Sequence, residues 1–377
     1  MAIKKKQKSF SSFVNNPFDF PLVITIIILL SMGLVMVLSA SSPSSLAESG
    51  DSYVYFSKQL FFAIAGIILM FFISKIDYRF FKNFYKHAWW ISAAMLVLVL
   101  IAGKEVKGAT RWLSITDTFS FQPSEVVKIF MIIFYAGILT KNKDKLNKYF
   151  SGFILNILYV VPIIGLLVLQ PHLSASIVIL GTVTIMIIIA GAKLRHFILT
   201  GLFAGVPLLG LAILLEPYRL ERFITFLDPW KDPSDTGYQV IQSLYAIGSG
   251  GLFGVGLGES KQKFLYIPEP HNDFIFSILG EELGFIGCAI VIVLFAIFIW
   301  RGIVIAMKAP DMFGSLIAIG ITSLVAIQAI INIAVVTSSM PATGMPLPFF
   351  SYGGTALLIL LSSMGILLNI SRASAKT

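Results

Sequence analysis

The feature that most constrains this 377-residue chain is a recurring run of apolar residues. Each run is about 20 residues long, the length at which an α-helix crosses the hydrocarbon core of a bilayer. Such a helix also satisfies its own backbone polar groups in lipid. We therefore predict an all-α polytopic membrane protein with about ten transmembrane helices. The predicted spans are residues 20–42, 57–75, 86–103, 122–140, 152–170, 174–192, 197–215, 273–300, 312–338 and 352–370.

Composition favours one membrane domain without a separate soluble domain. Hydrophobic residues make up 57% of the chain and charged residues 12%, against roughly 25% charged residues in soluble domains. We expect a single transmembrane domain over residues 17–371, between basic cytoplasmic tails at 1–16 and 372–377. The N-terminal lysines and first apolar run also resemble a signal peptide, but the run from Phe20 to Leu38 exceeds the usual h-region of about 7–15 residues. A retained first span is expected, with cleavage near Ala40 as the alternative.

Positive charge predicts the orientation in the membrane. Most of the 28 Lys and Arg residues fall in alternate segments between the predicted spans and at the two termini. Cytoplasmic segments of membrane proteins carry such an excess of Lys and Arg. We therefore expect both termini to be cytoplasmic. The same rule accounts for most of the net charge of +9, which excludes nucleic-acid binding as its explanation.

A smaller set of basic residues is not explained by orientation. Most of them lie in two predicted outer loops, residues 104–121 and the large extracytoplasmic loop 216–272. The set comprises Lys58, Lys104, Lys107, Arg111, Lys128, Arg219, Arg222, Lys231, Lys261 and Lys263. Because topology does not require cations there, we infer a functional surface on the outer side.

A carboxylate, Asp273, stands where the large outer loop meets a long apolar helix. Aspartate suits the N-terminal cap of a helix, so capping is one interpretation. The other is catalytic, because a positioned carboxylate at a water–lipid boundary can accept a proton during a reaction. The residues alone support the two interpretations about equally.

Two further outer segments carry ionisable groups. Arg111 precedes a predicted helix on which Glu125 and Lys128 lie one turn apart. These residues form either a structural ion pair or part of an anion site, since ionisable groups in a span usually face a protein interior or a wet cavity. The second segment is Gln170–His172. A turn with solvated polar side chains explains it, and a lone histidine is weak evidence for a base or a metal ligand.

Two segments rich in glycine or proline complete the candidate regions. The run Gly248–Gly258 lacks the βαβ context of a dinucleotide fingerprint. Its glycines either let backbone N–H groups approach a phosphate or permit close helix packing. The segment Met340–Gly354 holds three prolines and three glycines. Non-helical backbone at this depth is tolerated only when buried in protein or lining a wet cavity, so we expect it to fold back into the outer mouth.

Together these segments resemble the SEDS family (shape, elongation, division and sporulation), which includes RodA, FtsW and SpoVE. The resemblance covers nearly the whole chain, although His172 stands where the family commonly has aspartate. Residues 260–264 and 367–372 are more similar to the FtsW/SpoVE branch than to RodA. The motifs that carry the resemblance are Gly108–Trp112, Gln122–Lys128, Gln170-Pro171, Gly237–Gln239, Pro268-Glu269, Asp273–Phe276, Glu281–Gly284 and Pro348–Gly354.

The resemblance implies a peptidoglycan glycosyltransferase that polymerises lipid II at the outer face of the bacterial cytoplasmic membrane, during cell division or sporulation. It implies Asp273 as the general base, and a class B penicillin-binding protein and other division proteins as partners at the septum. We expect Arg111, Lys128, Lys261, Lys263 and Ser351 to contact substrate. Glu125 is expected to orient Lys128, and a divalent cation (Mg²⁺ or Mn²⁺) is a candidate cofactor at the pyrophosphate.

Two other functions compete with this one. Ten spans with interrupted helices are compatible with a lipid II flippase or transporter. A transporter should carry its essential ionisable residues near the midplane, whereas here they cluster at the outer side. A non-catalytic scaffold for division proteins leaves the outer cations unexplained.

Overall fold

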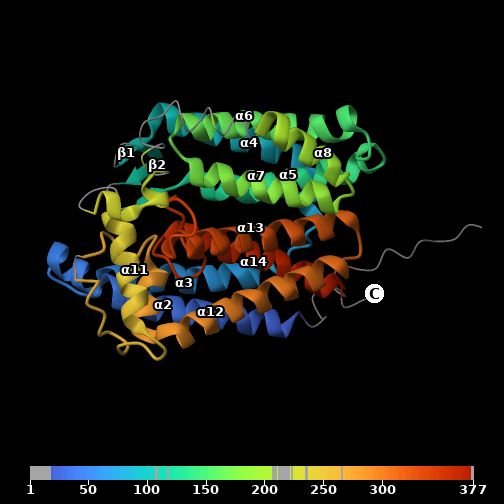
Figure 1. Cartoon of the computed structure of the whole chain (residues 1–377). Coiled ribbons are helices and arrows are strands. Elements are labelled where there is room, and N and C mark those ends of the chain that lie inside the picture. The colour runs from blue at the N-terminus through green and yellow to red at the C-terminus, as the bar shows by residue number, and fades with distance from the viewer. Residues whose placement is uncertain are drawn as a thin grey trace, which may run out of the picture.

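The computed structural model describes residues 18–106, 109–116, 119–205, 210, 221, 224–233, 237–264 and 266–374. Figure 1 shows a bundle of long helices with a small sheet and one crossing helix at one end. The long helices are α2 (Phe20–Ser49), α3 (Val54–Ile73), α4 (Phe80–Ala102), α5 (Pro123–Lys141), α6 (Leu155–Leu169), α7 (Leu173–Ile189), α12 (Ile275–Met307), α13 (Met312–Val336) and α14 (Gly354–Ser374). The shorter elements are α8 (Leu194–Thr200), α11 (Tyr238–Gly250), β1 (Lys104–Val106), β2 (Ala109–Thr116) and β3 (Phe119–Phe121).

Nine of the predicted spans correspond to these long helices. Among the described residues, eight helices are long and apolar enough to cross a membrane, and α7 is a shorter apolar helix. One of the eight is α6 extended by the π-helical segment Tyr149–Ile154. The predicted span 197–215 overlaps α8 and the π-helical segment Gly201–Gly205, and its remainder lies mostly outside the described residues. The multi-pass helical architecture is therefore confirmed, while the count of ten stays a prediction.

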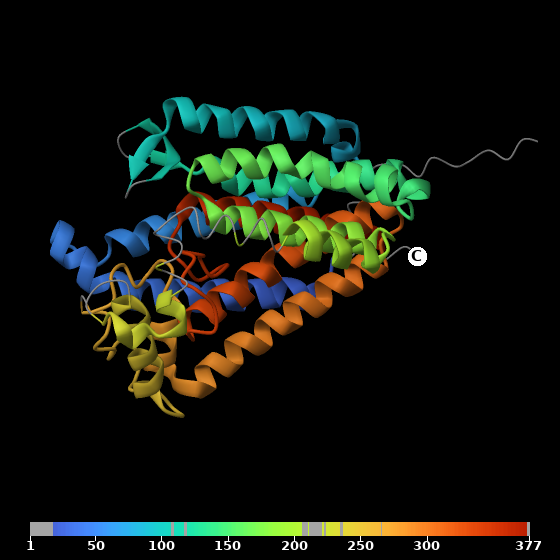
Figure 2. The same ribbon diagram turned by 45° about the horizontal axis from the view of Figure 1, so that its top comes forward.

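The helices pack as two groups joined by α13. One group holds α4, α5, α6 and α7, and the other holds α2, α3, α12 and α14 (Figures 1 and 2). Helix α13 contacts α5 and α7 of the first group and α12 and α14 of the second. It is consequently one of the most buried helices, together with α5 and α14. Helix α11 lies across the end of the bundle against α12 (Figure 1).

The predicted outer loop 104–121 folds into a small antiparallel sheet of order β1-β2-β3. Lys104 pairs with Trp112 across the first ladder, and Leu113 pairs with Phe121 across the second. Because β3 leads through Gln122 into Pro123 at the start of α5, the sheet fixes Arg111 and Trp112 close to the first turn of that helix.

Opposite the sheet, the expected cytoplasmic ends of several helices are joined by polar contacts. Asp19 caps α2 through the Leu22 amide and pairs with Arg301 of α12. The Asn369 side chain of α14 accepts from the Tyr78 amide at 2.9 Å and donates to the Ser74 carbonyl at 2.8 Å. These contacts lie at the end of the bundle away from α11 and the sheet (Figure 1). The cytoplasmic location of this end stays a prediction.

Gly33 allows α2 to lie close to the segment Met340–Gly354, which we refer to as the proline-rich segment. A Cβ atom added at Gly33 would lie 2.1 Å from the Phe349 carbonyl oxygen. A substitution there must push α2 or the segment away, whereas the same change at Gly165 of α6 meets no described atom within 4 Å.

We predict that Gly33→Ala lowers the thermal midpoint of the purified protein, since overpacking of this kind costs about 1–3 kcal/mol. The matched variant Gly165→Ala should hold or raise the midpoint, because alanine is favoured over glycine inside a helix by up to about 1 kcal/mol. Thermal unfolding in one detergent checks both. Equal midpoints for the two variants would contradict the close approach.

Candidate active site

A cavity of about 500 Å³ lies among the sheet, α5, α7, α13, α14 and the segment before α12. Its lining brings together five of the predicted site residues, Arg111, Glu125, Lys128, Asp273 and Ser351. Lys58 and His172, which the sequence also singled out, line the same cavity. The cavity also has an apolar side, to which α3 and α14 contribute Phe62, Leu357 and Leu360. A polar region beside an apolar one suits a substrate with a charged head and a hydrocarbon tail.

Asp273 does not cap α12. The helix begins at Ile275, and the residue in its N-cap position is Phe274, with no side-chain capping bond. The Asp273 side chain instead lines the cavity. A Cβ atom added at Gly344 would lie 3.2 Å from Asp273 Oδ2, so the proline-rich segment passes directly beside this carboxylate. The capping interpretation is therefore wrong, because the chain turns into helix two residues later.

Three consecutive backbone carbonyls hold Asp273 in place. The Tyr352 amide donates to the His271 carbonyl at 2.9 Å, and the Ser351 hydroxyl donates to the Asn272 carbonyl at 2.6 Å. The Asp273 carbonyl accepts from Asn332 Nδ2 at 2.7 Å. Since buried backbone polar groups in non-helical segments must find partners, these bonds fix the path of the chain through Asp273.

Asn332 was not found by sequence analysis. It lies on α13, is 1% exposed, and donates through Nδ2 to both the Asp273 and the Met345 carbonyls, at 2.7 and 2.6 Å. Asn332 therefore connects the backbone at Asp273 with the backbone of the proline-rich segment at Met345. In the sequence, Asn332 stands out only as a single amide side chain within an apolar run. That pattern does not indicate which backbone groups the amide binds.

The proline-rich segment is also hydrogen-bonded to α3, in addition to its bond to Asn332 of α13. Gln59 of α3 is buried, donates to the Ser351 carbonyl at 3.2 Å and accepts from the Gly353 amide at 3.1 Å. The Ser351 hydroxyl accepts from the Leu347 amide at 2.8 Å, in addition to its bond to Asn272. The expectation that this segment folds back into the bundle is met, and Ser351 has a positioning role in the described geometry.

Glu125 and Lys128 form an ion pair on the first turns of α5. Lys128 Nζ lies 2.7 Å from Glu125 Oε2, and the side chains are 4% and 14% exposed. The structural ion pair is therefore present. Both residues also line the cavity, so the pair places a cation and a carboxylate on the same wall. An anion-binding role for Lys128 stays a prediction.

His172 is buried beside these charges and is not part of a solvated turn. Its Nε2 lies 2.8 Å from Gln122 Nε2 and 3.2 Å from Ser124 Oγ, and its Nδ1 accepts from the Ala175 amide at 3.4 Å. Burial first, then the charges of Arg111 and Lys128, lower the pKa of His172 from its ordinary 6.5 to about 3. The imidazole is thus neutral at physiological pH.

The solvated-turn interpretation of Gln170–His172 is consequently wrong. Gln170 is 1% exposed and donates to the Leu96 carbonyl at 2.8 Å. Arg111 Nη2 donates to the Pro171 carbonyl, so this turn holds the guanidinium at the cavity. The turn therefore positions Arg111. The sequence did not predict this contact, because Arg111 and Pro171 lie 60 residues apart in the chain.

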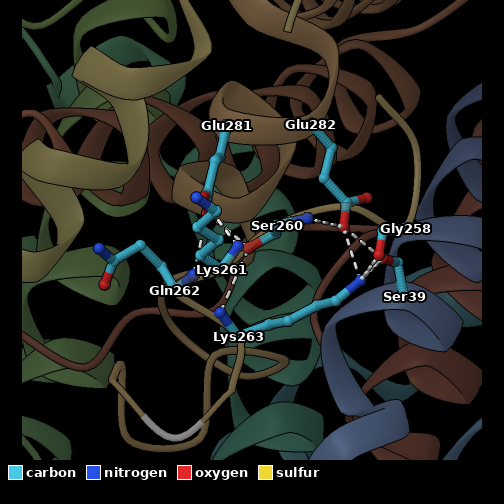
Figure 3. Close-up of polar contacts among 8 residues, drawn as sticks. All are labelled: Ser39, Gly258, Ser260, Lys261, Gln262, Lys263, Glu281 and Glu282. Atoms are coloured by element: carbon cyan, nitrogen blue, oxygen red, sulfur yellow. Dashed lines mark hydrogen bonds and ion pairs between the residues drawn. The ribbon is translucent and has the colours of Figure 1, made fainter. Parts of the chain in front are cut away.

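Lys261 and Lys263 are not among the residues that line the cavity. Lys263 is 4% exposed, and its ammonium lies 3.0 Å from both Glu282 Oε1 and Ser39 Oγ. The Lys261 amide donates to Glu281 Oε1 at 2.9 Å. Figure 3 shows the two glutamates of α12 reaching this segment. In this structure the charge of Lys263 neutralises a buried carboxylate away from the cavity.

The glycine run serves close packing in this structure. A Cβ atom added at Gly250 would lie 2.0 Å from the Gly280 carbonyl oxygen, and one at Gly254 would lie 2.1 Å from that of Glu282. The Val255 and Gly256 amides already donate to the carbonyls of Glu281 and Glu282. Those amides are therefore engaged by α12, which favours packing over a phosphate site.

The described residues contain no group of three or more His, Cys, Asp or Glu side chains arranged to hold a metal ion. The cavity nevertheless offers the carboxylates of Asp273 and Glu125. Mg²⁺ is commonly bound by one or two carboxylates together with waters and substrate phosphates. Both oxygens of Glu125 already contact the Lys128 ammonium, at 2.8 and 2.7 Å, so the candidate carboxylate for a cation shared with a phosphorylated substrate is Asp273, and such a cation stays a prediction. Lys107, Arg219 and Arg222, also noted in the sequence, lie outside the described residues.

Known proteins resemble the chain over nearly its whole length. It is 46% identical over 358 residues to the stage V sporulation protein E of Bacillus subtilis, covering 94% of this chain and 97% of that protein. It is 42% identical to the probable peptidoglycan glycosyltransferase FtsW of Trichlorobacter lovleyi, covering 94% and 93% of the two chains.

Solved structures show the same fold. A chain from a study of a peptidoglycan synthase complex that coordinates polymerization and crosslinking superposes with a TM-score of 0.79 at 29% identity, covering 95% of this chain and 98% of that one. The rod shape determining protein RodA of Thermus thermophilus superposes with a TM-score of 0.71 at 27% identity, covering 94% and 97%. The family model described as cell cycle protein FtsW/RodA/SpoVE matches residues 20–376, and the chain belongs to this family.

Proposed function

We propose that this protein is a peptidoglycan glycosyltransferase that polymerises lipid II at the outer face of the bacterial cytoplasmic membrane. The observation that carries the proposal is the convergence of Asp273, Arg111 and Lys128 on one cavity with an apolar side. Relatives named as probable peptidoglycan glycosyltransferases support it, because they share 42% identity or slightly less with the chain over 94% of its length.

The chemistry requires one proton acceptor. The 4-hydroxyl of one sugar attacks the anomeric carbon of another, a C–O bond forms, and the bond to the lipid pyrophosphate breaks with its electron pair leaving on the pyrophosphate. Asp273 takes the hydroxyl proton as general base. A positioned base of this kind contributes typically about 10²–10⁴-fold to the rate.

The leaving group requires positive charge. Lys128 and half-buried Arg111 lie on the lining of the same cavity, and the low exposure of Lys128 strengthens its interaction with a developing anion. Glu125 holds the Lys128 ammonium through the 2.7 Å ion pair. A bound Mg²⁺ or Mn²⁺ would supply further charge neutralisation at the pyrophosphate. The apolar side of the cavity near Phe62 and Leu360 suits the first part of the lipid tail.

The proposal includes a class B penicillin-binding protein as partner and the division septum as location. Its support is the similarity to a chain from a peptidoglycan synthase complex that coordinates polymerization with crosslinking, and to a sporulation protein. A lipid II transporter is the competing function. The predicted site residues Arg111, Glu125, Lys128 and Asp273 lie together at the cavity beside the sheet, as expected for chemistry at the outer surface.

We predict that the purified protein with its partner converts lipid II into glycan polymer, and that Asp273→Asn abolishes this product while Asp51→Asn retains it. Asp51 is an exposed aspartate that caps the Tyr53 amide and does not line the cavity. Gel analysis of labelled lipid II measures the polymer. In parallel vesicles, lipid II that crosses the bilayer without polymer formation would support the transporter instead.

Asn332 is predicted to position Asp273. In Asn332→Asp a carboxylate replaces the amide donor opposite two carbonyls, so the segment should shift. A displacement of about 1 Å at a reacting group can cost about 10²-fold in rate. We expect kcat to fall by at least about tenfold, with little change in KM.

The matched control for this prediction is Asn369→Asp. Asn369 is also a buried amide that donates to a backbone carbonyl, but it lies at the opposite end of the bundle. The Asn369→Asp variant should have lower thermal stability than the wild type and an unchanged kcat per folded molecule. If both variants lose activity in proportion to stability, Asn332 has only a structural role.

His172 is predicted to lower stability in acid. Because its folded-state pKa of about 3 lies below the ordinary value, the unfolded chain binds a proton that the folded protein excludes. The free energy of unfolding that the neutral His172 contributes is therefore lost as pH falls from about 6.5 toward 3. His172→Gln should show a smaller drop in thermal midpoint between about pH 7.5 and 5 than the wild type. An equal drop in both proteins would contradict the buried neutral imidazole.

A further inference from the structure

An apolar surface lies where the glycine run meets α12. It consists of Leu252, Phe253, Val255 and Leu257 of the run, with Phe285 and Ile286 of α12, and we refer to it as the apolar rim. Phe253 is 79% exposed, Phe285 is 65% exposed and Leu252 is 63% exposed. Between residues 251 and 258 every residue that is not glycine is apolar. Surfaces of this kind mark a site of contact with another apolar phase.

The rim is held in place by backbone bonds. The Phe285 amide donates to the Gly251 carbonyl at 2.8 Å, and the Ile286 amide donates to the Leu252 carbonyl at 3.2 Å. In the reverse direction, the Val255 and Gly256 amides donate to the carbonyls of Glu281 and Glu282. This reciprocal pairing requires the non-helical backbone of Gly284, whose φ is 64°. The backbone that carries the exposed side chains is therefore fixed against α12.

A buried polar cluster fixes the chain that follows the rim. Glu281 accepts from the amides of Lys261 and Gln262, at 2.9 and 3.3 Å. Glu282 accepts from Lys263 and from Ser39 of α2, which joins the cluster to the first helix (Figure 3). Breaking a buried ion pair is strongly destabilising, so this cluster holds the end of the glycine run against both α2 and α12.

The length of α12 places the rim at the membrane boundary. The helix runs for 33 residues to Met307, and Gly284 interrupts its geometry. From Phe285 to Met307 it extends about 34 Å at 1.5 Å per residue, close to the hydrocarbon thickness of about 30 Å. Phe285 therefore marks the outer edge of the span. The bonds from the run to residues 281–286 put Phe253 at the same height.

The rim continues the lipid-facing side of this helix. Ile290 and Val293 of α12 are exposed like Phe285 and Ile286. Figures 1 and 2 both place the connection between α11 and α12 at the edge of the molecule. Glycines with positive φ at 251, 254, 256 and 258 let the run turn outward while its backbone stays paired with α12.

We propose that the apolar rim inserts into the outer leaflet at the boundary between headgroups and acyl chains. Aromatic side chains are enriched at this depth of membrane proteins, and apolar faces of surface segments enter it by about 5–10 Å. The inserted rim holds the junction of the glycine run and α12 at this depth. The lipid contact does not depend on the reaction that the cavity performs.

Fluorescence quenching by brominated lipids tests the insertion. The single native cysteine, Cys288, is replaced by serine, and a cysteine at Phe253 is labelled with the fluorophore NBD. The full chain is placed in phosphatidylcholine–phosphatidylglycerol nanodiscs with or without lipids brominated high in the acyl chain. A matched label at exposed Lys231 serves as the water-facing control, and a label at Leu257 repeats the test in case the Phe253 variant is unstable.

We expect several-fold stronger quenching at positions 253 and 257 than at 231, with a blue-shifted emission. Quenching at positions 253 and 257 that is as weak as at 231 would overturn the proposal. Because the readout needs no turnover, its failure is distinguishable from failure of the proposed enzymatic function.

Discussion

The structure depends on the pairing of two non-helical segments inside the end of the bundle that carries the sheet and α11. The carbonyls of His271, Asn272 and Asp273 are each bound, by Tyr352, Ser351 and Asn332 respectively. Irregular backbone at this depth is stable only when its polar groups find partners within the protein. The same bonds that satisfy the backbone therefore define where the Asp273 carboxylate stands. Fold stability and site geometry are linked at this point.

Charges around the cavity follow a similar logic. Lys128 is paired with Glu125, and Arg111 is held by the Pro171 carbonyl, so both cations are fixed before any substrate arrives. His172, which its burial and both of these charges keep neutral, adds no further charge to the cavity. Preorganised cations of this kind stabilise a developing anion with little reorganisation. This arrangement supports the proposal that the cavity serves a reaction that releases negative charge.

The sequence predicted the helices well and the long-range contacts poorly. Apolar runs specify spans because a helix in lipid satisfies its own hydrogen bonds, so α2 to α7 and α12 to α14 fall where expected. The sheet of β1, β2 and β3 was missed because two of its strands have only three residues. Lys263 was predicted to contact substrate, whereas in the structure it pairs with Glu282. The sequence could not show this pair, because only the close packing of the glycine run on α12 brings the two residues together. Asn332 carried no charge or motif to mark it.

The most direct test of the central claim separates substrate binding from bond formation in Asp273→Asn. Lipid II affinity is measured by equilibrium binding, and the first glycosidic bond is measured in a single turnover with the same preparation. If Asp273 is the general base, affinity stays close to that of the wild type, while the rate falls by about 10²-fold or more. Loss of affinity with an unchanged rate of bond formation at saturating lipid II would contradict the account.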